Sequence, residues 1–182
     1  MNIYFSAPQN TSYQQNFVNN CAALLGNSGF EVFLAADPHF SNPSAYEQTR
    51  ESNGEPLISD ETNPGRLRKS AYANQVFADN IVKLIGSEAL VALLDGSQVD
   101  DRVACEIGIF YGLMRTDPTK KGILGLTTDI RCLGRRDSNY GINIFTLGTL
   151  EEVGEVKEDL DGILERLIQW KNNDFNDYDL TR

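Results

Sequence analysis

Short apolar segments alternate with amphipathic ones along most of the chain, and this alternation strongly constrains the fold. The segment 89–94 reads ALVALL, so it offers no polar residue to either face of a strand. A strand that is apolar on both faces is typical of the centre of a parallel sheet with helices on both sides. Strands that alternate with helices also predict a parallel sheet. We therefore predict an α/β fold.

The strands are predicted at 2–8, 30–36, 88–95, 121–129 and 142–148, and the helices at 12–26, 67–86, 103–114 and 150–170. These elements predict a single domain, a flavodoxin-like or Rossmann-like sandwich with a central five-stranded parallel sheet flanked by helices. Residues 37–66 are rich in Asn, Ser, Pro and Glu and lack periodicity, so we predict a loop or lid there. Residues 173–182 are predicted to form a polar tail.

Composition excludes several kinds of partner. The 182 residues carry a formal net charge of -10, which disfavours binding to nucleic acid and to anionic membrane surfaces. The apolar run at 89–94 is far too short to span a bilayer. Three scattered cysteines argue against a disulfide framework and predict a cytoplasmic location, and one histidine without metal-ligand spacing argues against a zinc site.

Ligands of open parallel sheets bind outside the carboxyl ends of the strands. In this sequence those ends carry Ser6 and Ala7, Asp37, Asp95, the segment 127–129 and the region after Phe145. No GxGxxG motif follows the first strand and no GxxxxGK motif occurs, so nothing in the sequence supports a dinucleotide or P-loop site. A phospho-receiver is disfavoured because Ser6 and Ala7 stand where it needs acidic residues.

Several acidic residues at this edge are candidates for catalysis, and each has an ordinary structural alternative. Glu106 lies at the border of an apolar helix face, where it could simply reach solvent. Asp100 precedes the helix, as a common N-cap does. Asp79 could be a solvated helical acid, and Asp37 a loop residue. From the residues alone, the acidic cluster is compatible with catalysis and with these structural roles.

The segment VALLDGSQVDDRVACEIGIFYGL resembles the signature of the nucleoside 2-deoxyribosyltransferases. In that pattern an apolar strand leads to Asp-Gly, and an Asp stands six residues before the Glu of a Glu-hydrophobic-Gly triplet, as Asp100 and Glu106 do here. IYFSAP, the Asp79 segment FADNIVKLIGSEALVALLDG, TTDIR and GINIF are similar to further parts of the family pattern. Arg102 and Val103 stand where many members have Gly-Thr.

The resemblance implies transfer of 2-deoxyribose between nucleobases through a covalent glycosyl intermediate on Glu106. It also implies a general-acid role for Asp79 and contacts from Asp100 to the sugar hydroxyls. The remaining substrate-binding residues that it implies are Tyr4, Ser6, Ala7, Asp37, Asn143 and Phe145. It implies neither a cofactor nor a metal.

The expected partners are deoxyribonucleosides, free purine or pyrimidine bases, and further copies of the chain in a homo-oligomer with shared active sites. Exposed apolar faces of the helices at 67–86 and 103–114 would form the contact between copies. Two alternatives stay open: a 2-deoxynucleoside 5'-monophosphate N-glycosidase, with water as the acceptor, and a non-catalytic nucleoside-binding sensor.

Overall fold

The computed structural model describes residues 1–35, 71–129 and 142–172. Its strands are β1 (Asn2–Ser6), β2 (Glu31–Leu34), β3 (Ala89–Leu93), β4 (Gly122–Leu126) and β5 (Gly154–Lys157). Its helices are α1 (Ser12–Asn27), α4 (Ala71–Gly86), α5 (Asp101–Met114), α7 (Ile144–Val153) and α8 (Leu160–Asn172). The chain divides into two compact units, one formed by Met1–Ala35 with Lys83–Arg182 and the other by Ala36–Val82.

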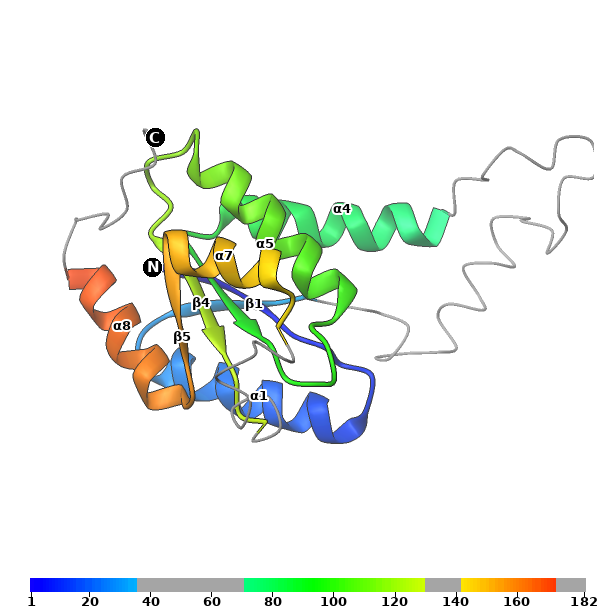
Figure 1. Ribbon diagram of the computed structural model, residues 1–182, viewed down its shortest axis with the longest axis horizontal. Coiled ribbons are helices and arrows are strands. Elements are labelled where there is room, and N and C mark those ends of the chain that lie inside the picture. Colours follow the sequence, from blue (N-terminus) through cyan, green and yellow to red (C-terminus); the bar gives the residue numbers. More distant parts are fainter. Residues whose placement is uncertain (36–70, 130–141, 173–182) are drawn as a thin grey trace, which may run out of the picture. The chain divides into compact units, whose positions relative to one another are not determined.

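The five strands form one sheet in which every pairing is parallel, with the order β2-β1-β3-β4-β5 (Figure 1). This is the flavodoxin-like strand order, and the predicted fold class is confirmed. All five residues of β3 and all five of β4 are buried, as their apolar sequence predicts. The order reverses direction between β1 and β3, which makes the carboxyl ends of these two strands a topological switch point.

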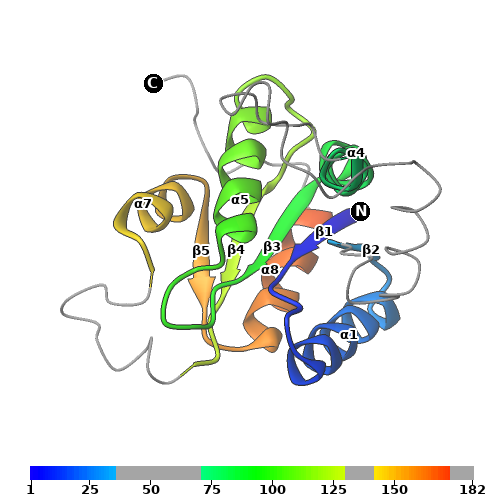
Figure 2. The ribbon, with the colours of Figure 1, turned by 90° about the vertical axis from the view of Figure 1, so that its right-hand side faces the viewer.

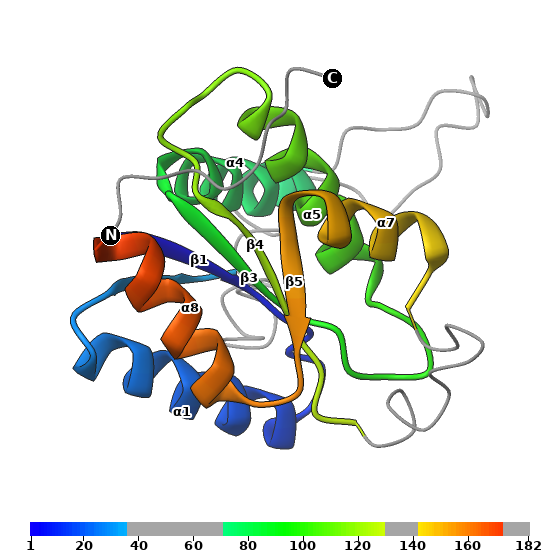
Figure 3. The same ribbon diagram turned by 60° about the vertical axis from the view of Figure 1, so that its left-hand side comes forward.

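Helices cover both faces of the sheet (Figure 2). Helices α1 and α8 lie on one face, where Val18, Leu25, Leu167 and Trp170 pack with strand residues that include Phe5 in one hydrophobic cluster. Helices α5 and α7 lie on the opposite face (Figure 3). Because strand side chains alternate between faces, Tyr4 and Ser6 point away from the cluster that contains Phe5.

Polar side chains cap the starts of three helices. Thr11 and Gln14 form a reciprocal capping box at α1. The Asp100 side chain accepts from the backbone N–H groups of Arg102 and Val103 at α5, and Asn143 accepts from Phe145 and Thr146 at α7. These bonds satisfy first-turn donors that have no partner within the helix.

The end of the chain corrects two predicted elements. The predicted strand 142–148 is wrong, because Asn143 caps a helix, α7, that begins at Ile144. The predicted helix 150–170 is also wrong over its first half: Leu150–Val153 complete α7, Gly154–Lys157 form β5, and α8 begins only at Leu160. Gly154 permits this arrangement, since a Cβ on it would lie 1.6 Å from the carbonyl oxygen of Ile123.

Helix α4 buries only part of its apolar side chains. In α4, Asn80 and Leu84 are buried, whereas Phe77 and Ile85 are exposed. An exposed apolar contact surface was predicted for the helices at 67–86 and 103–114. On α4 it has exposed members, because Val82 is exposed as well, but no large hydrophobic residue of α5 is exposed. No helix in the described ranges is long and apolar enough to cross a membrane.

Candidate active site

The Glu106 carboxylate is a buried acidic group at the switch point between β1 and β3. Its residue is 6% exposed, although an isolated carboxylate strongly prefers water. Two hydroxyls from β1 hold it: the Tyr4 hydroxyl donates to Oε1 over 2.9 Å, and the Ser6 hydroxyl donates to Oε2. Tyr4 and Ser6 are completely buried. Both carboxylate oxygens therefore have a fixed orientation.

Burial sets the charge balance at this carboxylate. Loss of hydration raises the pKa of Glu106 above its ordinary value of 4.5, while the Ser6 and Tyr4 hydrogen bonds and the positive charge of Arg102 oppose that rise. The negative charge of Asp100 adds to the increase in the pKa of Glu106. Burial, followed by the charge of Glu106 and the hydrogen bond to it, raises the pKa of Tyr4, so the phenol stays protonated and donates to the carboxylate.

We expect Glu106→Gln to be more stable than the wild type at pH 8. The folded-state pKa of Glu106 lies above its unfolded value, so the folded wild type loses stability as the pH rises from about 4.5 through the folded pKa. Each unit of the difference is worth about 1.4 kcal/mol. Thermal unfolding of the wild type and Glu106→Gln from pH 4 to 8 measures the difference in stability, and the exposed Glu165→Gln is the control. A Glu106→Gln protein with the same stability as the wild type at every pH would contradict the expectation.

Asp100 and Arg102 surround the start of α5, four to six residues before Glu106. One oxygen of Asp100, Oδ1, caps the helix by accepting from Arg102 N at 3.0 Å and Val103 N at 3.4 Å. The predicted N-cap reading of Asp100 is thus correct, and the second oxygen, Oδ2, accepts no hydrogen bond within the described parts of the chain. The Arg102 guanidinium donates to the carbonyl oxygen of Ala7 over 2.6 Å.

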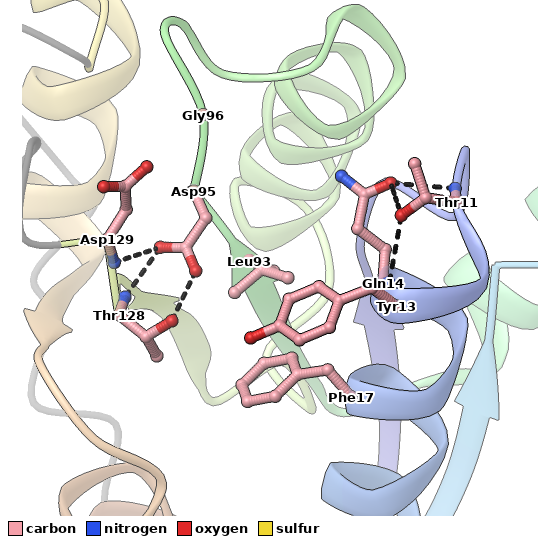
Figure 4. Close-up of a pocket in the computed structure, with 9 residues that line it drawn as sticks. All are labelled: Thr11, Tyr13, Gln14, Phe17, Leu93, Asp95, Gly96, Thr128 and Asp129. Carbon is pink, nitrogen blue, oxygen red and sulfur yellow. Dashed lines mark hydrogen bonds between the residues drawn. The ribbon is translucent and has the colours of Figure 1, made fainter.

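Asp95 joins the ends of β3 and β4, a contact that was not predicted from the sequence. Its carboxylate accepts from the Thr128 N–H at 2.6 Å, the Thr128 hydroxyl at 2.5 Å and the Asp129 N–H at 3.0 Å (Figure 4). The sequence signal is the pair of polar loops, DGS and TTD, that follow neighbouring apolar strands. Asp95 thereby fixes the loop that leads to Asp100 and α5.

A pocket of about 380 Å³ opens beside these hydrogen bonds to Asp95, between the first turns of α1 and the ends of β3 and β4 (Figure 4). Tyr13 and Phe17 form its aromatic side, and Asp95 and Asp129 lie on the opposite side. Its other lining residues are Thr11, Gln14, Leu93, Gly96 and Thr128. Glu106 is not among the residues that line it, and none of the α1 residues was predicted as a site residue.

The other predicted site residues differ in their surroundings. Ala7 is fully buried within the hydrophobic cluster and contributes its backbone carbonyl. Asn143 is an exposed cap, and Phe145 is 83% exposed in the first turn of α7. Asp79 is exposed on α4 within the unit 36–82, and Asp37 lies outside the described residues. Within the described ranges, no group of three His, Cys, Asp or Glu residues could hold a metal ion.

Comparison with known proteins identifies the family. The family model described as nucleoside 2-deoxyribosyltransferase matches residues 3–160. The chain belongs to this family. Apart from Asn2, the match includes all five strands, and it includes Tyr4 and Glu106, so the family assignment and the buried carboxylate concern the same part of the molecule.

Two solved structures have a similar fold. A conserved protein from Enterococcus faecalis V583 aligns with a TM-score of 0.59 at 20% identity, over 93% of this chain and 98% of that one. A 2-deoxyribosyltransferase from the psychrotolerant bacterium Bacillus psychrosaccharolyticus aligns with a TM-score of 0.55 at 16% identity, over 99% of this chain and 93% of that one. At these identities the similarity shows the fold. No curated protein sequence matches the chain.

Proposed function

We propose that this member of the deoxyribosyltransferase family transfers 2-deoxyribose from one nucleobase to another, with Glu106 as the nucleophile. The observation that carries the proposal is the environment of Glu106. It is a carboxylate with 6% exposure at the switch point of the sheet, held through both oxygens by Tyr4 and Ser6. A buried carboxylate is poorly hydrated, and a fixed one loses little freedom when it forms a bond.

In the first step a Glu106 oxygen bonds to the anomeric carbon as the bond to the departing base breaks. The bonding electrons leave with the base, which takes up a proton on a ring nitrogen. In the second step a ring nitrogen of another base attacks the same carbon and releases the carboxylate. Two displacements retain the configuration of the sugar, as in retaining glycosidases. The reaction transfers no electrons to an acceptor and needs no cofactor.

The hydroxyls of Tyr4 and Ser6 suit both steps. They hold the carboxylate in one rotamer, and Tyr4 remains a donor because burial and the charge of Glu106 raise the pKa of its phenol. When Glu106 forms the glycosyl ester, one oxygen leaves its hydrogen bond and the other retains it. The same donors favour the return of the carboxylate in the second step.

The remaining roles are proposals that rest on the family pattern. Asp79 would donate the proton to the departing base and accept it back from the incoming one. Asn143 would reach the sugar 5'-hydroxyl or the nucleophile of a second copy of the chain, with Phe145 beside it. The exposure of Asn143 and Phe145 is compatible with a homo-oligomer that completes its sites across the interface. Asp37 would face the base.

We expect Asp100 to combine helix capping with substrate binding, and two variants separate these roles. Asp100→Asn keeps a capping oxygen and should leave stability nearly unchanged, but it should raise KM by roughly tenfold because a charged acceptor for the sugar hydroxyl is lost. Asp100→Ala should show the same kinetic defect and also lose about 1 kcal/mol of stability. Steady-state kinetics with thermal unfolding measures both. A fully active Asp100→Asn would limit Asp100 to capping.

Incubation with a deoxynucleoside and a second free base tests the proposed function. Formation of a new deoxynucleoside supports transfer, whereas free deoxyribose as the only sugar product would indicate the N-glycosidase. Binding without either product would indicate the sensor. The glycosidase would need a phosphate-binding group near the first loop, but the Thr11 hydroxyl and the Gln14 N–H at the start of α1 are already bonded to each other.

A further inference from the structure

Arg102 connects the first turn of α5 to the end of β1. Its Nη2 donates to the Ala7 carbonyl oxygen over 2.6 Å, a bond between residues 95 positions apart. Ala7 directly follows Ser6, whose hydroxyl holds Glu106. The bond therefore joins the strand that supplies both donors to the helix that supplies the carboxylate. This bond uses one of the five donors that a guanidinium offers in one plane.

Glu106 lies four residues after Arg102 on the same helix. Residues at this spacing are neighbours on one helix face. The positive charge of Arg102 acts on the ionised form of Glu106 and favours it, together with the hydroxyls of Ser6 and Tyr4, whereas Asp100 disfavours it. Tyr4 from β1, with Arg102 and Asp100 from α5, are thus the titratable and charged groups that act on this carboxylate in the described structure.

We propose that Arg102 is a positioning residue for Glu106: it ties the start of α5 to the end of β1 and places a positive charge beside the carboxylate. Its catalytic consequence rests on the proposed function, because only a nucleophile must be ionised to act. Its electrostatic consequence does not, since the ionisation of Glu106 can be measured without substrate.

The physical argument compares the cost of burying a charge with what compensates it. A carboxylate that is 6% exposed loses most of its hydration, and two hydroxyl donors alone do not restore the ordinary pKa of Glu106. Arginine side chains stay charged throughout the pH range in which carboxylates titrate. Removing Arg102 would leave Asp100 as the nearby charge acting on Glu106 from α5, and a smaller fraction of Glu106 would be ionised at neutral pH.

The test is a carbon-13 NMR titration of protein labelled at the glutamate carboxyl carbon, with Glu106→Gln to assign the Glu106 signal. Arg102→Met removes both the charge and the bond to Ala7, Arg102→Gln removes the charge but keeps a donor, and Arg102→Lys keeps the charge. Exposed Arg115→Met, at the other end of α5, removes the same charge away from the site. Thermal unfolding confirms that each variant is folded.

We expect the Glu106 titration to move to higher pH in Arg102→Met and Arg102→Gln, to return most of the way in Arg102→Lys, and to stay in place in Arg115→Met. In the transfer assay, kcat/KM of Arg102→Met should fall roughly 3- to 10-fold more at pH 5.5 than at pH 8, mainly through kcat. A merely structural role would lower the rate equally at both pH values.

An unmoved Glu106 titration in folded Arg102→Gln would overturn the proposal, and this variant carries the test alone if Arg102→Met does not fold. Failure of Arg102→Lys to restore the titration would overturn the role of the charge. If the titration moves as expected but the wild type makes no new nucleoside, the proposed function fails while the positioning role of Arg102 stands.

Discussion

Glu106→Ala should lose deoxyribosyl transfer by on the order of 10³-fold or more, because no other group in the site would form the covalent bond to the sugar. Glu106→Gln should show a similar loss, since an amide has the shape of the carboxylate but is a very weak nucleophile. The fold should persist in both, because Tyr4 and Ser6 lie on β1 within a sheet that Glu106 does not build. The base-exchange assay measures the rate, and circular dichroism checks the fold.

The covalent step has its own readout. Incubation of the wild type with a 2-fluoro-2-deoxynucleoside should add the mass of the fluorinated sugar to the intact protein, and peptide mapping should place it on Glu106. Exposed Glu165→Gln is the matched control and should keep full activity and full labelling. A Glu106→Ala protein that transfers at near the wild-type rate, or an adduct on a different residue, would refute the assignment.

Gly154→Ala should destabilise the protein by about 3 kcal/mol or more, which corresponds to a fall in Tm of roughly 10 °C. The added Cβ would lie 1.6 Å from the carbonyl oxygen and 2.7 Å from the carbonyl carbon of Ile123, its partner in the β4–β5 pairing. Backbone atoms of a central strand cannot move aside as a flexible side chain can. The two strands must therefore separate at this point, and thermal and denaturant unfolding measure the cost.

Gly148→Ala is the matched control for this prediction. Gly148 lies in the preceding helix α7, and a Cβ added there would meet no atom within 4 Å. Alanine is a better helix former than glycine by roughly 0.5–1 kcal/mol, so this variant should be as stable as the wild type or slightly more stable. If the free energy of unfolding of Gly154→Ala lies within about 0.5 kcal/mol of the wild-type value, β5 does not approach β4 as closely as described.

The sequence predicted the parallel α/β sheet and four of its strands because the burial of a strand requires apolar residues in that segment. ALVALL has no polar face, and GILGL is apolar from end to end, so each can lie only inside a sheet that is covered on both sides. The N-cap at Asp100 was also visible in the sequence, because an aspartate before a helix is an ordinary capping residue. Strand 5 was misplaced.

The misplacement has a physical explanation. INIFTLG is rich in β-branched and aromatic residues, which favour strands, but the Asn143 side chain caps the segment into a helix whose Thr146 and Leu150 are buried. The real strand, GEVK, has only four residues and is half-buried throughout. Its Val156 also continues the helical spacing of the residues that follow. Only pairing with β4, which requires Gly154, distinguishes it from a helix.

Some features of the candidate site could likewise be predicted from the sequence, and others could not. The Asp100–Glu106 spacing and the family pattern were visible in the sequence, as were Tyr4 and Ser6 at the end of a strand. The sequence did not show the two hydroxyl bonds to Glu106, the bond from Thr128 to Asp95 or the bond from Arg102 to Ala7. Each of these joins residues that lie 33 to 102 positions apart. Local patterns of polarity specify which segments are buried. Which polar groups meet inside depends on strand order and register, and these emerge only when the sheet assembles.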